Sequence, residues 1–410
     1  MHLHGGVGRP EPGGRGDGSI GALAGAEQIY VLPQAWADAP WWSPAQADNV
    51  LAILDGVKRT YNVDENRVVL SGVSDGGSAA YYAAMYDTTP YASFLPLNGF
   101  VLVLANPSLR LQGPLFPHNL TNKPWFVVNG GRDPLYPAAR VEPVLRQFES
   151  RGLALTYRPQ PEAGHDTRWW PAVRDEFETF VRTHPREPHP ARLSWQTSDP
   201  SRQNRAHWLV IDRLGPGPTG EPLPDVNDVI GGEAPNFGLQ SNGMRVTAVR
   251  AGSSAQAMGF RPDDVVLSVN ARVLPRGLDL TDFMAIYEPG AAMAFVVERQ
   301  GATATLKGTY EPTLQARVTP LFPVATSSGR VDLVRDGNTV RATTRGVAAF
   351  TLLLSPDVFD FGRPVTVVAD GRTVYRGLVT RSVATLARWA ARDNDRTMLY
   401  GAELHVTLTP

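Results

Sequence analysis

The chain of 410 residues contains no cysteine, which excludes disulfide bonds, thiolate metal sites and a cysteine nucleophile. Charged residues make up only 19% of it, and the net charge of -1 argues against a nucleic-acid partner. No apolar run approaches the ~20 residues of a membrane-spanning helix, so we expect no membrane span. Apolar residues nevertheless reach 42%, which is the composition of a globular protein.

The length predicts two or three domains, at roughly 150 residues per domain. Two stretches rich in proline or glycine, 183–190 and 215–235, interrupt the pattern of regular structure. They divide the chain into an α/β domain, a β-sandwich in two parts and a unit inserted between those parts. The predicted boundaries are 1–186 for the α/β domain, 187–224 and 316–410 for the sandwich, and 225–315 for the inserted unit.

Strand-like and helix-like patterns alternate in the first domain. The predicted strands are 28–32, 67–71, 125–128 and 154–158, and the predicted helices are 46–61, 76–85, 141–150 and 166–182. This alternation predicts an α/β fold, a doubly wound and mostly parallel sheet covered on both faces. By contrast, residues 322–380 are nearly all strand-like, with Asp336-Gly337 and Asp370-Gly371 as hairpin turns. A helix is predicted at 382–391.

The segment Gly72-Val73-Ser74-Asp75-Gly76 follows a predicted strand and opens a predicted helix. Gly-x-Ser-x-Gly in that context is typical of a nucleophile elbow, where a sharp turn exposes the serine hydroxyl. We therefore interpret Ser74 as a nucleophile. The alternative is a serine that only caps the helix.

A serine nucleophile needs a base and a carboxylate that orients the base, in the hydrolase chain order Ser, Asp, His. Asp133 follows the strand at 125–128, and His165 follows the strand at 154–158. Loops at the carboxyl ends of parallel strands meet at one edge of a sheet, so the three residues are candidates for a triad. Alone, Asp133 is also typical of a turn and His165 of a helix cap or a surface.

The segment His4-Gly5-Gly6 offers backbone N–H groups for an oxyanion hole, and the N–H of Asp75 offers another. We expect Gly5 or Gly6 to act together with Asp75. His2 and His4 also form a possible metal pair, but no acidic residue lies close to them in sequence. We therefore expect neither a metal nor a cofactor.

Taken together, these motifs resemble the α/β-hydrolase superfamily, nearest to polyhydroxybutyrate depolymerases, feruloyl esterases and dienelactone hydrolases. The residues that carry the resemblance are Leu3-His4-Gly5-Gly6, Val63–Val68, Gly72–Gly76, Gly130–Asp133 and Gly164–Asp166. It implies a serine ester hydrolase that forms an acyl-enzyme on short-acyl, aryl or polymeric esters, and it favours an extracytoplasmic location. In that family the His-Gly motif follows the third strand, so we expect the first strands to be missing here.

Tryptophans near the predicted site, Trp41, Trp42 and Trp169, are candidates for the walls of a substrate pocket. The alternative is that these amphipathic rings pack over the rim of the sheet.

A second resemblance covers about 232–312, through Asn236–Leu239, Met244–Val249, Gly252–Ala255 and Met258–Asn270. These segments resemble a bacterial PDZ domain, as in high-temperature-requirement proteases. The resemblance implies that Phe237-Gly238-Leu239 binds the carboxylate of a peptide C-terminus, beside a groove helix at 281–287. The alternative is a structural unit that binds nothing.

Two other functions stay open at this point. One is a serine peptidase of the prolyl-oligopeptidase kind, in which the PDZ unit recruits peptides, because the same triad cleaves esters and amides. The other is a binding scaffold in which the hydrolase half is inert.

Overall fold

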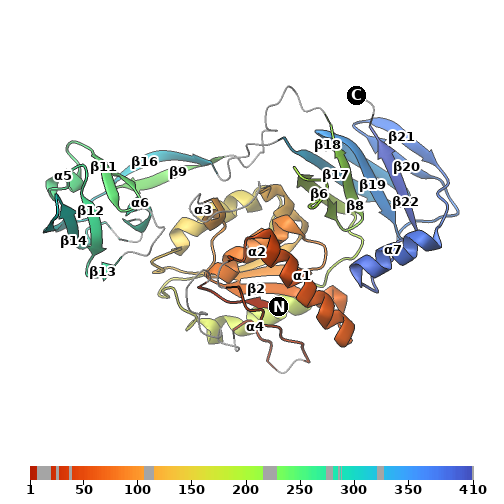
Figure 1. The fold of residues 1–410 in the computed structure, drawn as a ribbon, viewed down its shortest axis with the longest axis horizontal. Helices are drawn as coiled ribbons and strands as arrows, with labels where there is room; N and C mark the ends of the chain where they lie inside the picture. The colour runs from red at the N-terminus through yellow and green to blue at the C-terminus, as the bar shows by residue number, and fades with distance from the viewer. Residues whose placement is uncertain are drawn as a thin grey trace.

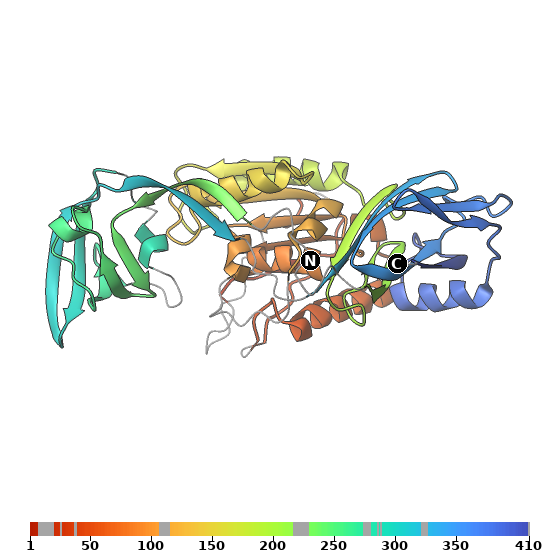
Figure 2. The same cartoon turned by 90° about the horizontal axis from the view of Figure 1, so that it is seen from above.

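The computed structural model describes residues 1–6, 20–24, 27–36, 39–105, 115–215, 229–273, 280–284, 287, 289–320 and 327–408. An α/β unit occupies the middle of the molecule, and a unit made mainly of β-strands lies on either side of it (Figure 1). The view from above shows the same arrangement (Figure 2). Among the described residues, no helix combines the length and apolar character that crossing a membrane requires.

The central unit is built on five parallel strands that follow one another across the sheet in chain order. They are β1 (His2–Leu3), β2 (Val69–Val73), β3 (Ser93–Leu97), β4 (Pro124–Gly130) and β5 (Ala154–Gln160). In the register, Ser71 of β2 pairs with His2 on one side and Leu95 on the other. All the carboxyl ends therefore lie at one edge, where the loops that follow the strands gather.

Helices cover both faces of this sheet, because side chains along each strand alternate between two cores. Phe94, Trp125 and Val127 share one core with α1 (Pro44–Thr60), α2 (Asp75–Tyr86) and α3 (Ala138–Glu149). Leu95, Phe126 and Val128 share the other with α4 (Trp170–Thr183). The predicted α/β class, a parallel sheet covered on both faces together with further β units, is confirmed. Short 3-10 helices cover Glu65–Arg67, Val101–Ala105 and Pro117–Asn122.

Three element predictions in this unit were wrong. Residues 28–32 form no strand, although Val31 O accepts a hydrogen bond from His2 N–H. No strand was predicted at the position of β3. This strand contains Pro96, and proline ordinarily argues against a central strand. The helix expected from 166 begins only at Trp170, because Asp166–Trp169 form the turn that follows His165.

The C-terminal side is a β-sandwich whose strands come from both flanks of the inserted unit. One sheet has the order β21-β20-β18-β17-β6 and the other β22-β19-β8-β7. Trp195 and Trp208 from the first part share a core with Phe350 and Leu352 from the second. The strands are β6 (Arg192–Thr197), β7 (Arg205–Ala206), β8 (Leu209–Leu214), β17 (Gly329–Asp336), β18 (Thr339–Arg345), β19 (Val347–Leu354), β20 (Val365–Ala369), β21 (Arg372–Gly377) and β22 (Ala402–Thr407).

Both hairpins predicted in the sandwich are present. Ala369 pairs with Arg372, so Asp370 and Gly371 form a two-residue turn, and their φ angles of 49° and 80° match the left-handed pair of a type I′ turn. The other hairpin joins β17 to β18, but Asp336 pairs with Thr339, so its turn is Gly337-Asn338, one residue later than predicted. The predicted helix is α7 (Val383–Asp393), and Ser382 Oγ caps it by accepting from Thr385 N–H.

The inserted unit is an antiparallel sheet at the end of a two-stranded ribbon (Figure 2). The ribbon pairs β9 (Val229–Asn236) with β16 (Thr313–Pro320). The sheet has the order β10-β11-β12-β14-β15, and β13 pairs with β12. Its elements are β10 (Leu239–Asn242), β11 (Arg245–Val249), α5 (Ser254–Ala257), β12 (Val265–Val269), β13 (Arg272–Val273), α6 (Leu280–Met284), β14 (Ala292–Arg299) and β15 (Ala302–Thr309). The PDZ assignment and the domain boundaries stay predictions.

Candidate active site

Ser74 lies on the sharp turn between β2 and α2, with φ 56° and ψ -116°. A non-glycine residue rarely adopts this conformation, so the surrounding structure has to hold it. The flanking glycines allow that. A Cβ on Gly72 would lie 2.4 Å from the Gly76 carbonyl carbon, and one on Gly76 would lie 2.0 Å from Leu3 O. Backbone fills both places, which explains the glycines of the Gly-x-Ser-x-Gly motif.

The structure brings the three predicted triad residues together. His165 Nε2 lies 2.8 Å from Ser74 Oγ, and His165 Nδ1 lies 2.7 Å from Asp133 Oδ2. The Asp133 side chain is fully buried, whereas the His165 side chain is 21% exposed. In this arrangement Nδ1–H donates to the carboxylate, and Nε2 is free to accept the proton of the Ser74 hydroxyl.

The second oxygen of Asp133 is held by backbone. Its Oδ1 accepts hydrogen bonds from Leu135 N–H at 2.7 Å and from Tyr136 N–H at 3.0 Å. With Oδ2 on His165, the carboxylate is fixed in direction from both sides. The Tyr136 ring meets the His165 ring edge-on, with centroids 5.6 Å apart. Burial, followed by the nearby charges of Asp75 and Asp133, raises the pKa of Tyr136, which therefore stays neutral.

The predicted oxyanion segment lies directly against the nucleophile. A Cβ on Gly5 would lie 2.8 Å from Ser74 Cβ and 3.1 Å from Val73 O. Gly6 has a φ of 72°, in the left-handed region that favours glycine. Asp75 is the first residue of α2, so its N–H belongs to the positive end of the helix dipole. The roles of Gly5, Gly6 and Asp75 as donors stay predictions.

His4 and Trp41 hold this segment in place. His4 Nε2 accepts a hydrogen bond from Ala35 N–H at 3.0 Å, so Nδ1–H is the donor to Gly5 O at 2.8 Å. Trp41 Nε1–H donates to His4 O at 2.9 Å. Two side chains thus fix the carbonyl groups on either side of the Gly5 N–H.

The tryptophans predicted as pocket walls are core residues in the structure, and we correct that prediction. Trp41 and Trp42 are 2% and 3% exposed and pack in the core beneath α1 and α2. Trp169 is 7% exposed and packs with Trp170 in the opposite core. The physical reason is their size, because each ring buries a large apolar area and gains more inside than at a rim.

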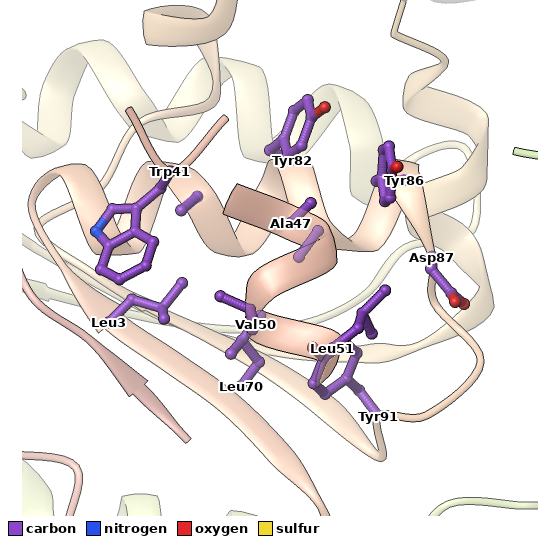
Figure 3. Close-up of a pocket in the computed structure, with 12 residues that line it drawn as sticks. Leu3, Trp41, Ala47, Val50, Leu51, Leu70, Tyr82, Tyr86, Asp87 and Tyr91 are labelled. Carbon is purple, nitrogen blue, oxygen red and sulfur yellow. The ribbon is translucent and has the colours of Figure 1, made fainter. Parts of the chain in front are cut away.

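A small hollow beside these residues is separate from the triad. It lies between α1 and α2, has a volume of about 20 Å³, and is lined mainly by apolar side chains such as Leu3, Trp41, Val50 and Tyr82 (Figure 3). That volume holds about one water molecule, so the hollow is a packing defect rather than a substrate site.

The possible metal ligands are engaged elsewhere. His2 Nδ1 lies 2.8 Å from Ser71 Oγ, and both ring nitrogens of His4 bond to backbone. Over the described parts of the chain, no group of three or more histidine, aspartate or glutamate side chains is placed to hold a metal ion.

The predicted carboxylate loop of the inserted unit is tightly packed. Phe237 and Leu239 are buried in its core. Gly238 has a φ of 96°, and a Cβ there would lie 2.1 Å from Ser253 Cβ. Its N–H donates to Asn236 Oδ1 at 2.7 Å, so in this structure a side-chain oxygen occupies the donor predicted to bind a peptide carboxylate.

Two residues at the site were missed from the sequence, Tyr136 and Asn98. Asn98 is fully buried at the end of β3 and donates through Nδ2 to Asp166 O, the carbonyl next to His165. The pair Asn98-Gly99 is a turn signal in the sequence, but the turn lay beside an unrecognised strand.

No family model matches the chain. A bifunctional acetylxylan esterase/xylanase of Neocallimastix patriciarum is 28% identical over 126 residues, which are 30% of this chain and 17% of that protein. The solved structure of esterase PE8 is 17% identical, covers 34% of this chain and 62% of its own, and has a TM-score of 0.26. The PDZ domain of HtrA3 is 18% identical, covers 21% of this chain and 91% of its own, and has a TM-score of 0.17. Over 126 residues, the chain is thus similar to a bifunctional acetylxylan esterase/xylanase, of which it covers only 17%.

Proposed function

We propose that the chain is a serine hydrolase that cleaves carboxylic esters through an acyl-enzyme. The hydrogen-bonded series from Ser74 Oγ through His165 to Asp133, with contacts of 2.8 and 2.7 Å, is the observation that carries this proposal. A nucleophile, a base within reach of its proton and a carboxylate that orients the base are the parts that acyl transfer needs.

In the first half of the reaction, Ser74 Oγ attacks the ester carbonyl carbon while His165 Nε2 takes the hydroxyl proton. Asp133 stabilises the imidazolium that results. The tetrahedral intermediate collapses, the alcohol leaves with the proton from His165, and the acyl group stays on Ser74. In the second half, water attacks this ester and gives its proton to His165. The acid is released, and the proton returns to Ser74 Oγ.

The negative oxygen of each tetrahedral intermediate needs donors that are fixed before the reaction. We assign this role to the N–H of Gly5 or Gly6 and to the N–H of Asp75. The contact of Gly5 with Ser74, and the two side chains that hold the Gly5 segment, support it.

The substrates that we propose are short-acyl, aryl or polymeric esters. The similarity to an acetylxylan esterase over 126 residues adds acetyl esters on a polysaccharide to this range. A serine peptidase is the competing function. Turnover of p-nitrophenyl butyrate without turnover of Ala-Pro-p-nitroanilide supports the esterase, and the reverse result rejects it.

Intact mass after treatment with a fluorophosphonate probe tests the nucleophile directly. We expect one adduct on the full chain and none on the Ser74→Ala variant. A folded chain without an adduct would mean that the hydrolase half is inert, which leaves the scaffold function.

We further propose that the unit of β10–β15 binds a peptide C-terminus as a PDZ domain does. The left-handed backbone of Gly238 (φ 96°) between buried Phe237 and Leu239 supports this, and a bound carboxylate would replace Asn236 Oδ1 as the acceptor of the Gly238 N–H. Calorimetric titration with a random-sequence C-terminal peptide library and its amidated counterpart tests it. Binding of the free-acid library alone supports the proposal, and equal binding or none contradicts it.

A further inference from the structure

The end of β3 contacts Ser74 and the loop that carries His165. The carbonyl of Leu97, the last residue of β3, accepts a hydrogen bond from Ser74 N–H at 2.9 Å. The side chain of the next residue, Asn98, donates through Nδ2 to Asp166 O at 2.8 Å. Two consecutive residues therefore hold the nucleophile and the loop of the base to one strand end.

Asn98 is itself held in a conformation that few residues adopt. Its φ is 49°, in the left-handed region where asparagine is enriched among non-glycine residues. Its N–H donates to Val128 O of β4 at 2.7 Å. The next residue, Gly99, lies so close to α2 that a Cβ on it would fall 2.4 Å from the Gly77 carbonyl carbon. The Asn98 amide is thus presented from a rigid turn.

The side-chain amide is only half satisfied. Asn98 is fully buried, and among the residues that the structure describes its Oδ1 has no hydrogen-bond partner. A buried polar atom without a partner destabilises the folded state. The amide is therefore not explained by stability alone, and its other half, Nδ2, is the part that bonds to the His165 loop.

The outer side of that loop is fixed differently. The Asp166 carboxylate faces Arg168, and Arg168 Nη2 lies 2.8 Å from Asp166 Oδ2. The backbone carbonyl of Asp166 is therefore the group that bonds to Asn98. Further back, Arg132 N–H donates to Ala163 O at 2.9 Å. Asn98 is the side chain that ties the loop to the strand beside the nucleophile.

We propose that Asn98 is a positioning residue, which sets the distance and direction of His165 Nε2 relative to Ser74 Oγ by holding the Asp166 carbonyl. The inference rests on the proposed hydrolase function. Asn98 acts through the His165 loop. Its loss should therefore slow the steps in which His165 moves a proton and leave substrate binding largely unchanged.

The Asn98→Gly variant removes the amide and keeps a residue that accepts a φ of 49°. We expect kcat for p-nitrophenyl butyrate to fall by about 10- to 100-fold, the size of effect that misplaced catalytic groups produce, with KM within about twofold. The rate of fluorophosphonate labelling should fall by the same factor, because it needs the same proton transfer. Asn98→Asp, which keeps the size of the side chain, should lose activity as well.

Asn119→Ala is the control. Asn119 is also fully buried, and its Nδ2 donates to Gln196 O at 2.9 Å, away from the Asn98-Gly99 turn and the His165 loop. We expect its kcat to stay within about threefold of the wild-type value. Urea midpoints of all variants separate slowed chemistry from unfolding.

Equal losses of kcat in the Asn98 and Asn119 variants, or a normal labelling rate in Asn98→Gly, would overturn the positioning role. An unlabelled wild-type chain would instead overturn the hydrolase function, so the two failures are distinguishable.

Discussion

A single methyl group decides whether the Gly5 segment can lie against Ser74. The Cβ of an alanine at position 5 would approach Ser74 Cβ to 2.8 Å, so the segment has to move away from the nucleophile. If Gly5 helps to bind the oxyanion, Gly5→Ala should lower kcat by roughly 10²–10³-fold, the usual effect of losing one such donor. Steady-state kinetics measure this. A kcat within about threefold of the wild-type value would exclude Gly5 from the oxyanion hole.

Trp41 offers a second test at the level of one residue, because the sequence suggested a pocket wall and the structure places it in the core. Trp41→Phe keeps most of the ring and removes the hydrogen bond from Nε1 to His4 O. One such bond contributes about 1 kcal/mol to stability. Because this one holds the carbonyl next to the Gly5 N–H, we also expect kcat to fall several-fold with KM unchanged. A rise in KM at constant kcat would restore the pocket interpretation.

At the scale of elements, α1 contains a glycine without a structural purpose that we can find. Nothing lies within 4 Å of the Cβ that Gly56 would gain, and its φ is not in the left-handed region. Gly56→Ala should therefore stabilise the chain by about 0.4–1 kcal/mol by restricting the unfolded state. Urea denaturation measures this, and unchanged kcat shows that the site is unaffected. A lower urea midpoint would show that the α1 backbone is strained there.

How far the elements were predictable depended on whether their signals were local. Each strand and helix around the Ser74 turn has its own pattern, and β2, α2, β4 and α3 lie close to their predicted ranges. β3 was missed because Pro96 contradicts the usual composition of a central strand. The 28–32 segment has a strand-like composition, but it makes a backbone hydrogen bond to His2 without forming a ladder.

At the scale of the whole molecule, a buried ionic contact joins the sandwich to the α/β unit. Arg186 Nη2 lies 2.8 Å from Asp395 Oδ2, and both side chains are fully buried. Lys58 of α1 lies 3.7 Å from the same oxygen. Burial raises the pKa of Asp395, but Arg186, the hydrogen bond from Thr397 and Lys58 together outweigh it, so the net shift is downward and Asp395 is charged.

Removing one partner from such a contact should be costly. Arg186→Met leaves a buried carboxylate with a more distant cation, and we expect a loss of roughly 3–5 kcal/mol of stability. Arg59→Met is the matched control, because its partner Asp55 and Arg59 itself are both exposed, and it should cost less than about 1 kcal/mol. Urea midpoints compare the two. Equal midpoints would mean that the interface tolerates the loss.

The same interface should make stability depend on pH. Burial, then the nearby positive charges of Lys123 and Arg186, lowers the pKa of His207 well below its ordinary value of 6.5. His207 Nδ1–H donates to Pro188 O, and Nε2 accepts from Lys123. With one nitrogen donating and the other accepting, the His207 ring is neutral. The unfolded chain takes up a proton below pH 6.5 that the folded chain does not, so stability falls as the pH falls through this range.

We expect His207 to lower the free energy of unfolding by up to about 1.4 kcal/mol for each pH unit below 6.5. His207→Gln should show a smaller difference between the urea midpoints at pH 7.5 and pH 5.5 than the wild-type chain. An identical difference would show that other groups set the acid sensitivity.

By itself, the sequence determined the α/β class, the elbow around Ser74 and the identity of Asp133 and His165 as its candidate partners. These follow from short-range patterns, namely strand and helix periodicity, turn residues and chain order. Only the tertiary structure decided which groups hold the site. Asn98 and Asp166 lie 68 residues apart, and Trp41 and His4 lie 37 apart. Such contacts depend on the order in which strands pair in the sheet and on which loops meet at its edge. No local sequence pattern encodes a contact between residues so far apart in the chain.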